Sequence, residues 1–364
     1  MKQAKIKDIC IKGSSGLKQK DLLSDGKYPV YGASGVSGYL NSFHQEEPYI
    51  GIVKDGSGIG RVDFYPEKTS LIGTLQYILP KEGYEIRYIG YCLQSLDLSK
   101  YKQGAAIPHI YFRDYGERIV NVTDDLQEQQ RIVAMLDASF AEIDQLKVNA
   151  EKQLSEAKAL FQKVLAKAMT PKEGWEEKTV GELFETYAGG TPIKSNNDFY
   201  EGGNIPWIRS GEVCQKFITK CEVYITEKGM RNSSAKYFPV DTVLIAMYGA
   251  TAAQVGILKI KATTNQAVCG LLPNEKFNPI FVYYWFKNIQ EDLASQAQGG
   301  AQPNLSQIKI KKVKIPLIPL SKQQKIVEHL DALSEQVKQL EAIATKTATE
   351  CDALKQALLR QVFE

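Results

Sequence analysis

Two segments of the chain repeat each other: LQEQQRIVAMLDASFAEIDQLKVNAEKQLSEAKALFQKVLAKAM (residues 126–169) and LSKQQKIVEHLDALSEQVKQLEAIATKTATECDALKQALLRQVF (residues 320–363). Aligned without gaps at an offset of 194 residues, they share 17 identities in 44 positions. A period this long is unlike that of solenoid repeats, which runs to roughly 20–50 residues. We therefore interpret the repeat as a duplicated module.

Each copy is predicted to be one long helix. Neither contains Gly or Pro, and both are rich in the strong helix formers Ala, Leu, Gln, Glu and Lys. Apolar residues step alternately by three and four positions, which is the pattern of a coiled-coil seam. Lys147 is the polar exception in the first seam, and Leu354 belongs to the second. The seam and candidate subunit-interface positions are Leu136, Ile143, Ala150, Ala157, Val164, Leu330, Val337, Ala344, Cys351 and Leu358.

An apolar seam of this length needs a partner, because an exposed stripe would aggregate. Each copy is the obvious partner of the other, which predicts an antiparallel coiled coil. Thr170-Pro171 ends the first helix, because Pro lacks the N–H and restricts the residue before it. The alternative is a pair of helices packed on an ordinary core.

The segments before the two helices also correspond, more loosely. Both carry short β-type runs separated by Gly and Pro, and GAAIPHI (104–110) matches GGAQPNL (299–305). The sequence thus predicts an α+β protein with a pseudo-twofold internal repeat, in which two mostly β or mixed domains are separated by the helices. The expected boundaries are 1–122, 123–170, 171–319 and 320–364.

Composition places the chain among ordinary soluble proteins, with 43% apolar and 24% charged residues. No run of about 18 apolar residues is present, and the N-terminus lacks a secretory core, so we expect a cytoplasmic protein. The six cysteines form no CxxC pair, which favours reduced, packed thiols over a metal or disulfide framework. The net charge of +3 does not by itself indicate nucleic-acid binding.

Catalytic motifs are missing from the sequence. There is no phosphate-binding G-x-x-x-x-G-K-[ST], no G-x-S-x-G and no [ND]-P-P-[YF], and the three histidines lack metal-ligand spacing. Two binding domains of different sequence on a shared helical frame are typical of a protein whose domains each recognise a target and whose helices set the distance between them. The alternatives are a non-catalytic protein-binding adaptor and a stand-alone DNA-modifying enzyme.

A family resemblance rests on motifs in both halves. Gly189-Gly190-Thr191-Pro192, followed by Tyr200 and by Gly202 to Ile208, resembles the opening of a target-recognition domain in the specificity (S) subunits of type I restriction-modification enzymes. Similar motifs are Tyr28 to Gly35, Leu244 to Thr251, Thr264-Asn265-Gln266, Gln302-Pro303-Asn304, Gln129-Gln130-Arg131-Ile132-Val133 and Gln323-Gln324-Lys325-Ile326-Val327. The first half departs from the pattern, since it has no GGTP and Pro108-His109 stands where Pro303-Asn304 stands.

The resemblance implies a non-catalytic subunit that selects the DNA sequence. Each target-recognition domain would read one half of a bipartite, asymmetric site in double-stranded DNA, and the helices would set the gap. Two methyltransferase (M) subunits, which use S-adenosylmethionine, and restriction (R) subunits, which use ATP and Mg²⁺, would be the partners. No cofactor is expected on this chain itself.

Candidate DNA contacts are polar side chains beside glycine-rich turns, because such turns allow close approach to DNA, although they also suit plain turn chemistry. For Trp207, core packing is the favoured interpretation, and the alternative is a role in the DNA face. An exposed strand face is also expected at Lys309, Lys311, Lys312 and Lys314, where a solvated surface is favoured over contact with phosphates. The candidates are Tyr31, Ser34, Lys54, Arg61, Lys102, Gln103, His109, Arg209, Ser210, Gln254, Gln298, Gln302 and Asn304.

Overall fold

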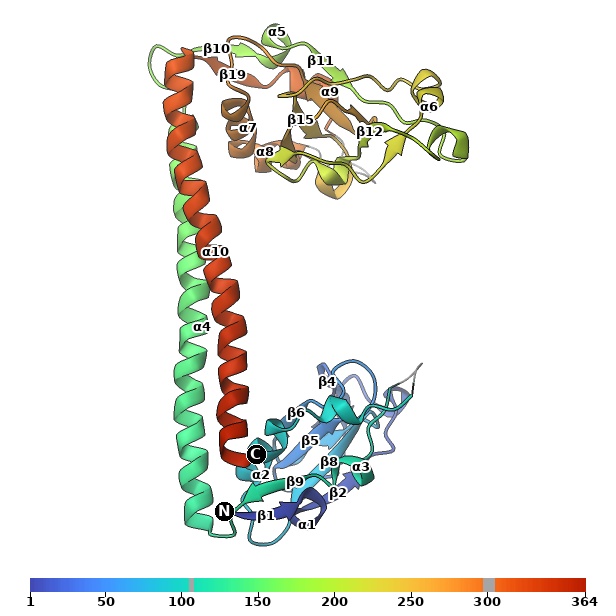
Figure 1. Cartoon of the computed structure of the whole chain (residues 1–364), viewed down its shortest axis with the longest axis vertical. Coiled ribbons are helices and arrows are strands. Elements are labelled where there is room, and N and C mark those ends of the chain that lie inside the picture. Colours follow the sequence, from blue (N-terminus) through green and yellow to red (C-terminus); the bar gives the residue numbers. More distant parts are fainter. Residues whose placement is uncertain (105–107, 297–304) are drawn as a thin grey trace. The chain divides into compact units, whose positions relative to one another are not determined.

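The computed structural model describes residues 1–104, 108–296 and 305–364. It divides into two compact units: unit 1 is Met1–Lys152 with Ala342–Glu364, and unit 2 is Gln153–Glu341. Each unit holds one globule and a stretch of both long helices, α4 (Leu126–Met169) and α10 (Leu320–Phe363). The predicted α+β class with two long helices is confirmed (Figure 1). Among the described residues, no helix has the length and apolarity to cross a membrane.

The globule of unit 1 is built on two small sheets. The first has the order β2-β8-β5-β6 and is antiparallel throughout, the second has the order β4-β3-β7, and β1 pairs with β9. The strands are β1 (Lys2–Lys5), β2 (Cys10–Ser14), β3 (Tyr28–Gly32), β4 (Gly35–Leu40), β5 (Tyr49–Val53), β6 (Val62–Tyr65), β7 (Ser70–Leu71), β8 (Leu75–Pro80) and β9 (Ile119–Val122). The helices are α1 (Ile6–Ile9), α2 (Ile86–Ser95) and α3 (Phe112–Tyr115), with 3₁₀ turns η1 (Gln19–Asp21) and η2 (Leu98–Tyr101).

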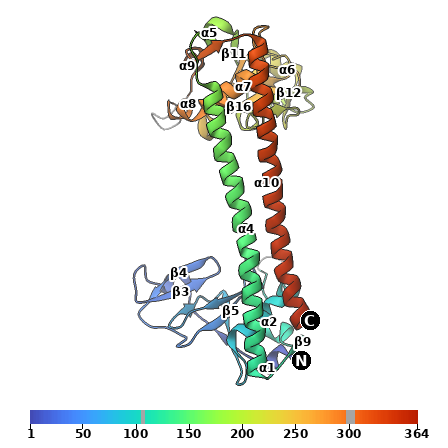
Figure 2. The same ribbon diagram turned by 90° about the vertical axis from the view of Figure 1, so that its left-hand side faces the viewer.

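Strand β5 lies at the centre of this globule, and all five of its residues are buried. Its sequence YIGIV is apolar on both faces, as expected for a strand covered on both sides. Gly51 is required at its middle, because a Cβ there would overlap with the Tyr65 ring. Helix α2 packs on the sheet, and its Arg87 and Tyr91 bond to Asp137 of α4; the two helices overlap in the view of Figure 2.

The globule of unit 2 repeats the plan with a larger sheet of order β11-β18-β15-β16-β13, a smaller one of order β14-β12-β17, and the pair β10-β19. The strands are β10 (Glu176–Thr179), β11 (Thr186–Ala188), β12 (Ile205–Ile208), β13 (Phe217–Ile218), β14 (Tyr224–Ile225), β15 (Val243–Ala246), β16 (Val255–Leu258), β17 (Thr263–Thr264), β18 (Val268–Leu271) and β19 (Lys314–Leu317). The helices are α5 (Val180–Leu183), α6 (Glu227–Arg231), α7 (Pro279–Asn288), α8 (Gln290–Gln296) and α9 (Gln307–Lys311), with 3₁₀ turns η3 (Asn197–Phe199), η4 (Ser210–Glu212) and η5 (Gly249–Thr251).

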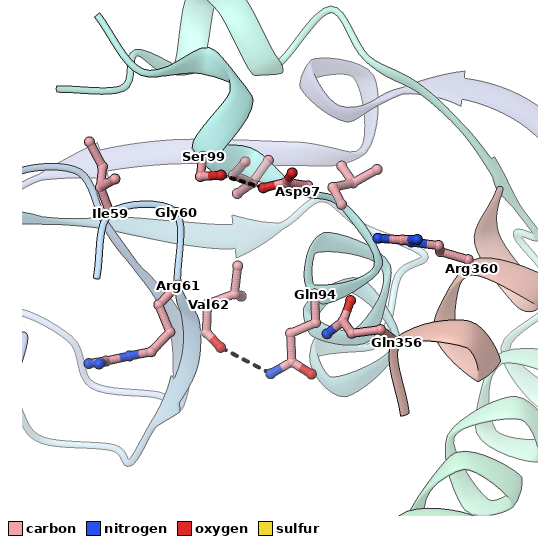
Figure 3. Close-up of a pocket in the computed structure, with 11 residues that line it drawn as sticks. Ile59, Gly60, Arg61, Val62, Gln94, Asp97, Ser99, Gln356 and Arg360 are labelled. Carbon is pink, nitrogen blue, oxygen red and sulfur yellow. Dashed lines mark hydrogen bonds between the residues drawn. The ribbon is translucent and has the colours of Figure 1, made fainter. Parts of the chain in front are cut away.

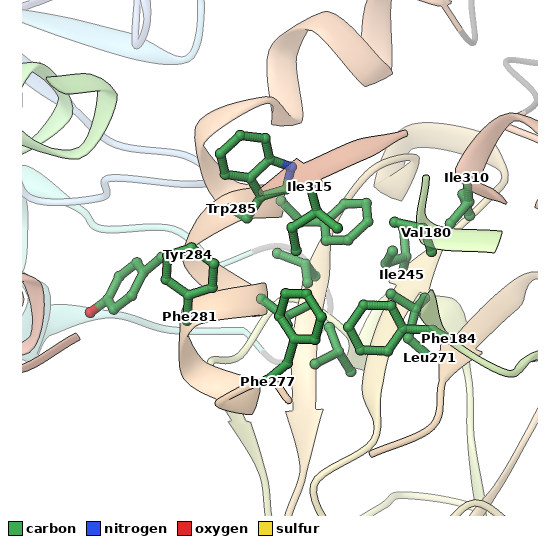
Figure 4. Packing of buried hydrophobic residues seen from close by; sticks show 14 of the residues in the cluster. Val180, Phe184, Ile245, Leu271, Phe277, Phe281, Tyr284, Trp285, Ile310 and Ile315 are labelled. Atoms are coloured by element: carbon green, nitrogen blue, oxygen red, sulfur yellow. The ribbon is translucent and has the colours of Figure 1, made fainter. Parts of the chain in front are cut away.

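The main core of unit 2 lies between α7 and the larger sheet (Figure 4). Phe277 and Phe281 pack with Ile245 and Leu271 of the sheet, and the Phe184 ring contacts that of Phe277 at a tilt of 45°, with ring centroids 4.9 Å apart. Leu165 and Met169 at the end of α4, and Val327 and Leu330 at the start of α10, belong to the same cluster. The globule is therefore fixed to both helices by apolar burial.

Ion pairs define how the two helices pack within each unit. In unit 1, Lys147 pairs with Asp352 at 2.9 Å and Lys355 pairs with Asp144 at 2.6 Å; in unit 2, Lys158 pairs with Glu341 at 2.8 Å. The two residue numbers of each pair add up to 499, so the helices are antiparallel and keep one register in both units.

The predicted seam is mostly buried or half-buried, including the ten positions that were candidates for a subunit interface. The placement of Leu354 in the seam is wrong, since this side chain is 47% exposed. Lys355 lies in the seam instead, with its Nζ 5.4 Å from the centre of the Phe140 ring. The same ammonium donates to Asp144 at 2.6 Å, so an amphipathic lysine takes the place of an apolar seam residue.

The predicted strand through Lys309 and its neighbours is also wrong in part. Ser306 caps a short helix, α9, by accepting from the Lys309 N–H at 3.3 Å, and only Lys314 lies in a strand. A capped turn competes with a strand wherever the alternation is as short as this.

Candidate nucleic-acid interface

Two equivalent glutamines fix both globules to the helical frame in the same way. Gln129 accepts from the Glu85 N–H at 2.7 Å and donates to the carbonyls of Gly83 and Thr123. Gln323, at the same place in the second copy, accepts from the Asn278 N–H at 2.8 Å and donates to the carbonyls of Lys276 and Ile318. Glu85 and Asn278 are the N-caps of α2 and α7, and both glutamines are fully buried.

A second equivalent pair uses carboxylates. Asp137 accepts from the Tyr91 hydroxyl and from Arg87, while Asp331 accepts from the Tyr284 hydroxyl at 2.5 Å and from Lys216. The tyrosines come from α2 and α7, but the cations come from different places in the two globules. The carboxylate–tyrosine contact is therefore shared by the two globules, whereas the cation that joins it is not.

The polar turns of the first globule come together beyond the end of β5. The turn after β5 contains Gly56, Gly58 and Gly60, all with positive φ (79°, 80° and 87°), a backbone region that favours glycine. This turn is joined to the segment before α3 by the hydrogen bond from the Ile110 N–H to the Lys54 carbonyl at 3.0 Å. The sequence candidates Lys54, Arg61 and His109 are thus brought onto connected loops.

Several candidates in this globule already have protein partners. The Arg61 guanidinium binds Asp63 at 2.7 Å and the Ala33 carbonyl, and the Gln103 amide donates to Asp114 at 2.9 Å. The ring nitrogen Nδ1 of His109 bonds to Asp55. Those contacts would have to be shared or broken before the same groups could bind DNA.

The remaining candidates of the first globule are placed more simply. Tyr31 is half-buried, with its ring centroid 5.1 Å from that of Tyr65. Ser34 is exposed in the turn between β3 and β4, and Lys102 is exposed beside Gln103. Lys54 is half-buried, and its side chain has no partner among the described residues.

A cavity of about 510 Å³ lies beside these loops in unit 1. Gln94 donates to the Val62 carbonyl at 3.0 Å across it, and Gln356 and Arg360 of α10 line another side (Figure 3). Arg61 contributes its stem, but its guanidinium points away from Arg360 (Figure 3). The cavity therefore does not gather the candidate DNA contacts.

In the second globule the candidates are more dispersed. Arg209 is exposed and binds Glu212 at 3.5 Å as well as Glu222, and Ser210 is half-buried at the start of η4. Gln254 is half-buried, following Ala253 with a positive φ of 66°. The other candidates, Gln298, Gln302 and Asn304, lie outside the described residues.

The glycine-rich opening of the second globule is held from inside. The Trp207 indole N–H donates to the Gly190 carbonyl at 2.9 Å, and the Tyr200 hydroxyl donates to the Pro192 carbonyl at 2.6 Å. Trp207 is 4% exposed, so it packs in the core and positions the loop. A Cβ on Gly190 would overlap with the Ala235 backbone, which explains the glycine.

Some surface groups in the second globule were missed by sequence reasoning. Lys236 lies 4.7 Å above the Tyr187 ring and Lys261 lies 4.3 Å above the Tyr237 ring. In the sequence, the adjacent residues Lys236 and Tyr237 could have indicated a basic and aromatic surface here. Asn265 Oδ1 is buried without a hydrogen-bond partner, the one such side-chain atom in the part of the chain that the structure describes. Within that part, no cluster of His, Cys, Asp and Glu could hold a metal ion.

Comparison with known proteins identifies the family. The profile described as "Type I restriction modification DNA specificity domain" matches residues 1–156 and 172–347. The specificity subunit of the Escherichia coli type I enzyme EcoR124I/EcoR124II is 28% identical over 258 residues, covering 68% of this chain and 62% of that protein. The specificity subunit of the MjaIX enzyme of Methanocaldococcus jannaschii is 31% identical over 188 residues, covering 50% of this chain and 43% of that protein.

Solved structures agree on the fold. A chain from work on complex assembly and conformational transition of the type I R-M system has a TM-score of 0.76 at 16% identity, covering 99% of this chain and 97% of that one. The HsdS subunit of Thermoanaerobacter tengcongensis has a TM-score of 0.58 at 17% identity, covering 99% and 96%. Because the family profile covers most of the sequence in two copies, the chain belongs to the type I restriction-modification DNA specificity family.

Proposed function

We propose that the protein is the specificity subunit of a type I restriction-modification complex and that each globule reads one half of a bipartite, asymmetric sequence in double-stranded DNA. The observation that carries the proposal is the equivalence of Gln129 and Gln323, which hold the two globules to one frame by the same three hydrogen bonds. A frame of this kind presents two readers in equivalent settings.

The loops on that frame differ, which supports an asymmetric site. The first globule carries the His109–Asp55 pair, and the second carries the GGTP loop held by Trp207. Specific reading requires side chains that differ in their hydrogen-bonding groups at base edges. Two different sets of loops therefore suit two different half-sites.

Partner docking is supported by exposed leucines on the helices. Leu160 in unit 2 and Leu354 in unit 1 are equivalent in the repeat and are 58% and 47% exposed. A single exposed leucine is common on a soluble protein, so it is the recurrence at the same place in both copies of the repeat that supports docking. We assign them to two methyltransferase subunits, one for each copy of the repeat, with restriction subunits joining through these.

The chain itself is proposed to be non-catalytic and cytoplasmic, and to bind no cofactor. Its sequence has no [ND]-P-P-[YF] tetrapeptide of DNA amino-methyltransferases and no phosphate-binding loop. S-adenosylmethionine would be used by the methyltransferase subunits, and ATP with Mg²⁺ by the restriction subunits.

The test is methylation sequencing of DNA from cells that co-express the chain with its cognate methyltransferase subunit. A single bipartite sequence with unequal halves is expected, and the chain alone should transfer no methyl group. Replacing residues 171–319 by the corresponding domain of a relative should change one half-site only. If the exchange changes the recognised sequence of both half-sites, the assignment of one globule to each half-site is contradicted.

A further inference from the structure

The backbone of His109 is fully tied to its neighbours. Its N–H donates to the Gln103 carbonyl at 2.8 Å, and its own carbonyl accepts from the Gln103 N–H at 2.9 Å. The next residue, Ile110, donates to the Lys54 carbonyl at 3.0 Å. His109 is therefore held between two loops of the first globule rather than on a free loop tip.

The imidazole ring is held as firmly as the backbone. Its Nδ1 bonds to a carboxylate oxygen of Asp55, and the ring contacts that of Tyr111 at a tilt of 46°, with ring centroids 4.2 Å apart. Asp55 is anchored in turn by its N–H, which donates to the Thr74 carbonyl at 3.2 Å. Arg113 covers the Tyr111 ring, with its guanidinium carbon 4.4 Å from the ring centre.

One hydrogen-bonding group of His109 is left over. The side chain is 26% exposed, and its Nε2 has no partner among the residues that the structure describes. A carboxylate can only accept, so Asp55 selects the tautomer with the proton on Nδ1. In the neutral ring, Nε2 is then an acceptor with a fixed direction. Preorganisation of this kind is what a selective contact requires.

We propose that His109 reads one base of the first half-site, with Nε2 accepting a hydrogen bond from the exocyclic amino group of adenine or cytosine in the major groove. Adenine N6 and cytosine N4 are the amino donors that this groove presents. Asp55 is the positioning residue that fixes the tautomer and the ring. The inference rests on the proposed function, because it assigns a base contact within the proposed DNA-reading surface.

The second globule is built differently at the corresponding place. The Leu305 N–H donates to the Met247 carbonyl at 2.8 Å, as Ile110 does to Lys54, so the two loops are joined in the same way. Tyr248 follows Met247, however, where Asp55 follows Lys54. The carboxylate is thus a feature of the first globule, and its effects are confined to one half-site.

The experiment uses the chain in complex with its cognate methyltransferase subunit and a duplex library in which each position of the methylated sequence is randomised in turn. Retained duplexes are sequenced for the wild type and for His109→Ala, His109→Gln, His109→Asn, Asp55→Ala and Asp55→Asn. Gln places its amide near Nε2, whereas Asn places its amide near Nδ1. Asp55→Asn keeps an oxygen that accepts from Nδ1–H, and Asp55→Ala does not.

At one position of the first half-site, the wild type should prefer an amino-bearing base over the alternatives by about tenfold, near the lower end of the discrimination that a bidentate base contact gives. His109→Ala and His109→Asn should abolish that preference, and His109→Gln should keep it. Asp55→Ala should weaken the preference at the same position, and Asp55→Asn should restore most of it. The second half-site should be unchanged in all five variants.

Three results would overturn the inference. His109→Ala could retain every preference, it could weaken all positions equally while thermal melting shows a folded complex, or His109→Gln and His109→Asn could behave alike. If any variant does not fold, the remaining members of the set still decide between these results. If the wild-type complex selects no bipartite sequence at all, the proposed function has failed instead.

Discussion

Lys147 of α4 donates a hydrogen bond to Asp352 of α10 at 2.9 Å from a position within the apolar seam. This bond raises the pKa of Lys147, so the side chain stays charged although only 27% of it is exposed. Polar seam residues cost stability but specify register, because a slipped alignment would leave them without a partner. With Lys355 and Asp144, the pair fixes the alignment of the helices in unit 1.

Reversing one charge of this pair should destabilise the chain. In Asp352→Lys, two ammonium groups face each other, so the urea midpoint should fall. The double variant Lys147→Asp with Asp352→Lys should regain most of the loss, because the pair is restored with opposite polarity. Denaturation followed by circular dichroism measures both. Equal midpoints for the single and double variants would mean that the pair does not set the register.

Replacing Gln129 by Leu should loosen unit 1. The change leaves the Glu85 N–H and the carbonyls of Gly83 and Thr123 without partners, at a cost of about 3 kcal/mol for buried polar groups. Amide hydrogen exchange should accelerate in the first globule, around α2. The matched variant Gln323→Leu should do the same around α7. Acceleration spread evenly over both units in either variant would contradict independent anchoring.

Alkaline pH should destabilise the protein through buried thiols and hydroxyls. Burial raises the pKa of Cys10 to about 12 and that of Tyr88 to about 12, against about 8.5 and 10 for exposed groups. The unfolded chain loses these protons first, so the stability is present below about pH 8.5 and is lost as pH rises toward 12.

The urea midpoint should therefore fall between pH 8 and pH 10, before tyrosines contribute fully. A Cys10→Ala variant starts from a lower midpoint because of the cavity, but its midpoint should fall less over this interval. Parallel decline of the wild type and the variant would rule out Cys10 as a source of the effect.

Lengthening both helices should lengthen the gap of the recognised site. Seven residues inserted after Leu154 and seven after Thr345 preserve the register given by the ion pairs, add about 10 Å and turn the helix by nearly two full turns. At about 3.4 Å per base pair, the gap should grow by about three base pairs. Methylation sequencing of DNA modified by the complex measures the length of this gap directly.

The control for this prediction is a four-residue insertion between Leu154 and Ala157 alone, which slips the seam and should lower the melting temperature. Half-site letters should stay the same with the paired insertions, since no loop of either globule changes. A folded protein with an unchanged gap would show that the length of the helices does not set the spacing between the half-sites.

The helices were predictable from sequence because 44 residues without Gly or Pro form one strongly periodic pattern. The seam was not fully predictable. The apolar pattern places Leu354 in the seam, but contacts with α4 cover Lys355 instead and leave Leu354 exposed. The His109–Asp55 pair joins residues 54 positions apart. Its partners are set by the pairing of two loops, which local patterns do not encode.

The mostly β structure of each globule was likewise predictable, from short apolar runs such as Tyr49 to Val53. The roles of single polar residues were not. Arg61 and Arg209 were chosen as exposed cations, yet both are engaged with carboxylates of their own globule. Distinguishing a free cation from a paired one requires the neighbours in space.

Leu359 and Phe363 of α10 are buried in the core of unit 1, at 2% and 0% exposure, where Phe363 packs on Tyr88. A ribosome makes these residues after every residue of unit 2, which is a continuous stretch of chain. Unit 2 can therefore finish folding while the first globule, made earlier, still exposes the apolar surface that the end of α10 will cover. The first globule is therefore begun first and completed last, and until α10 is made its uncovered apolar surface is open to aggregation or chaperone binding.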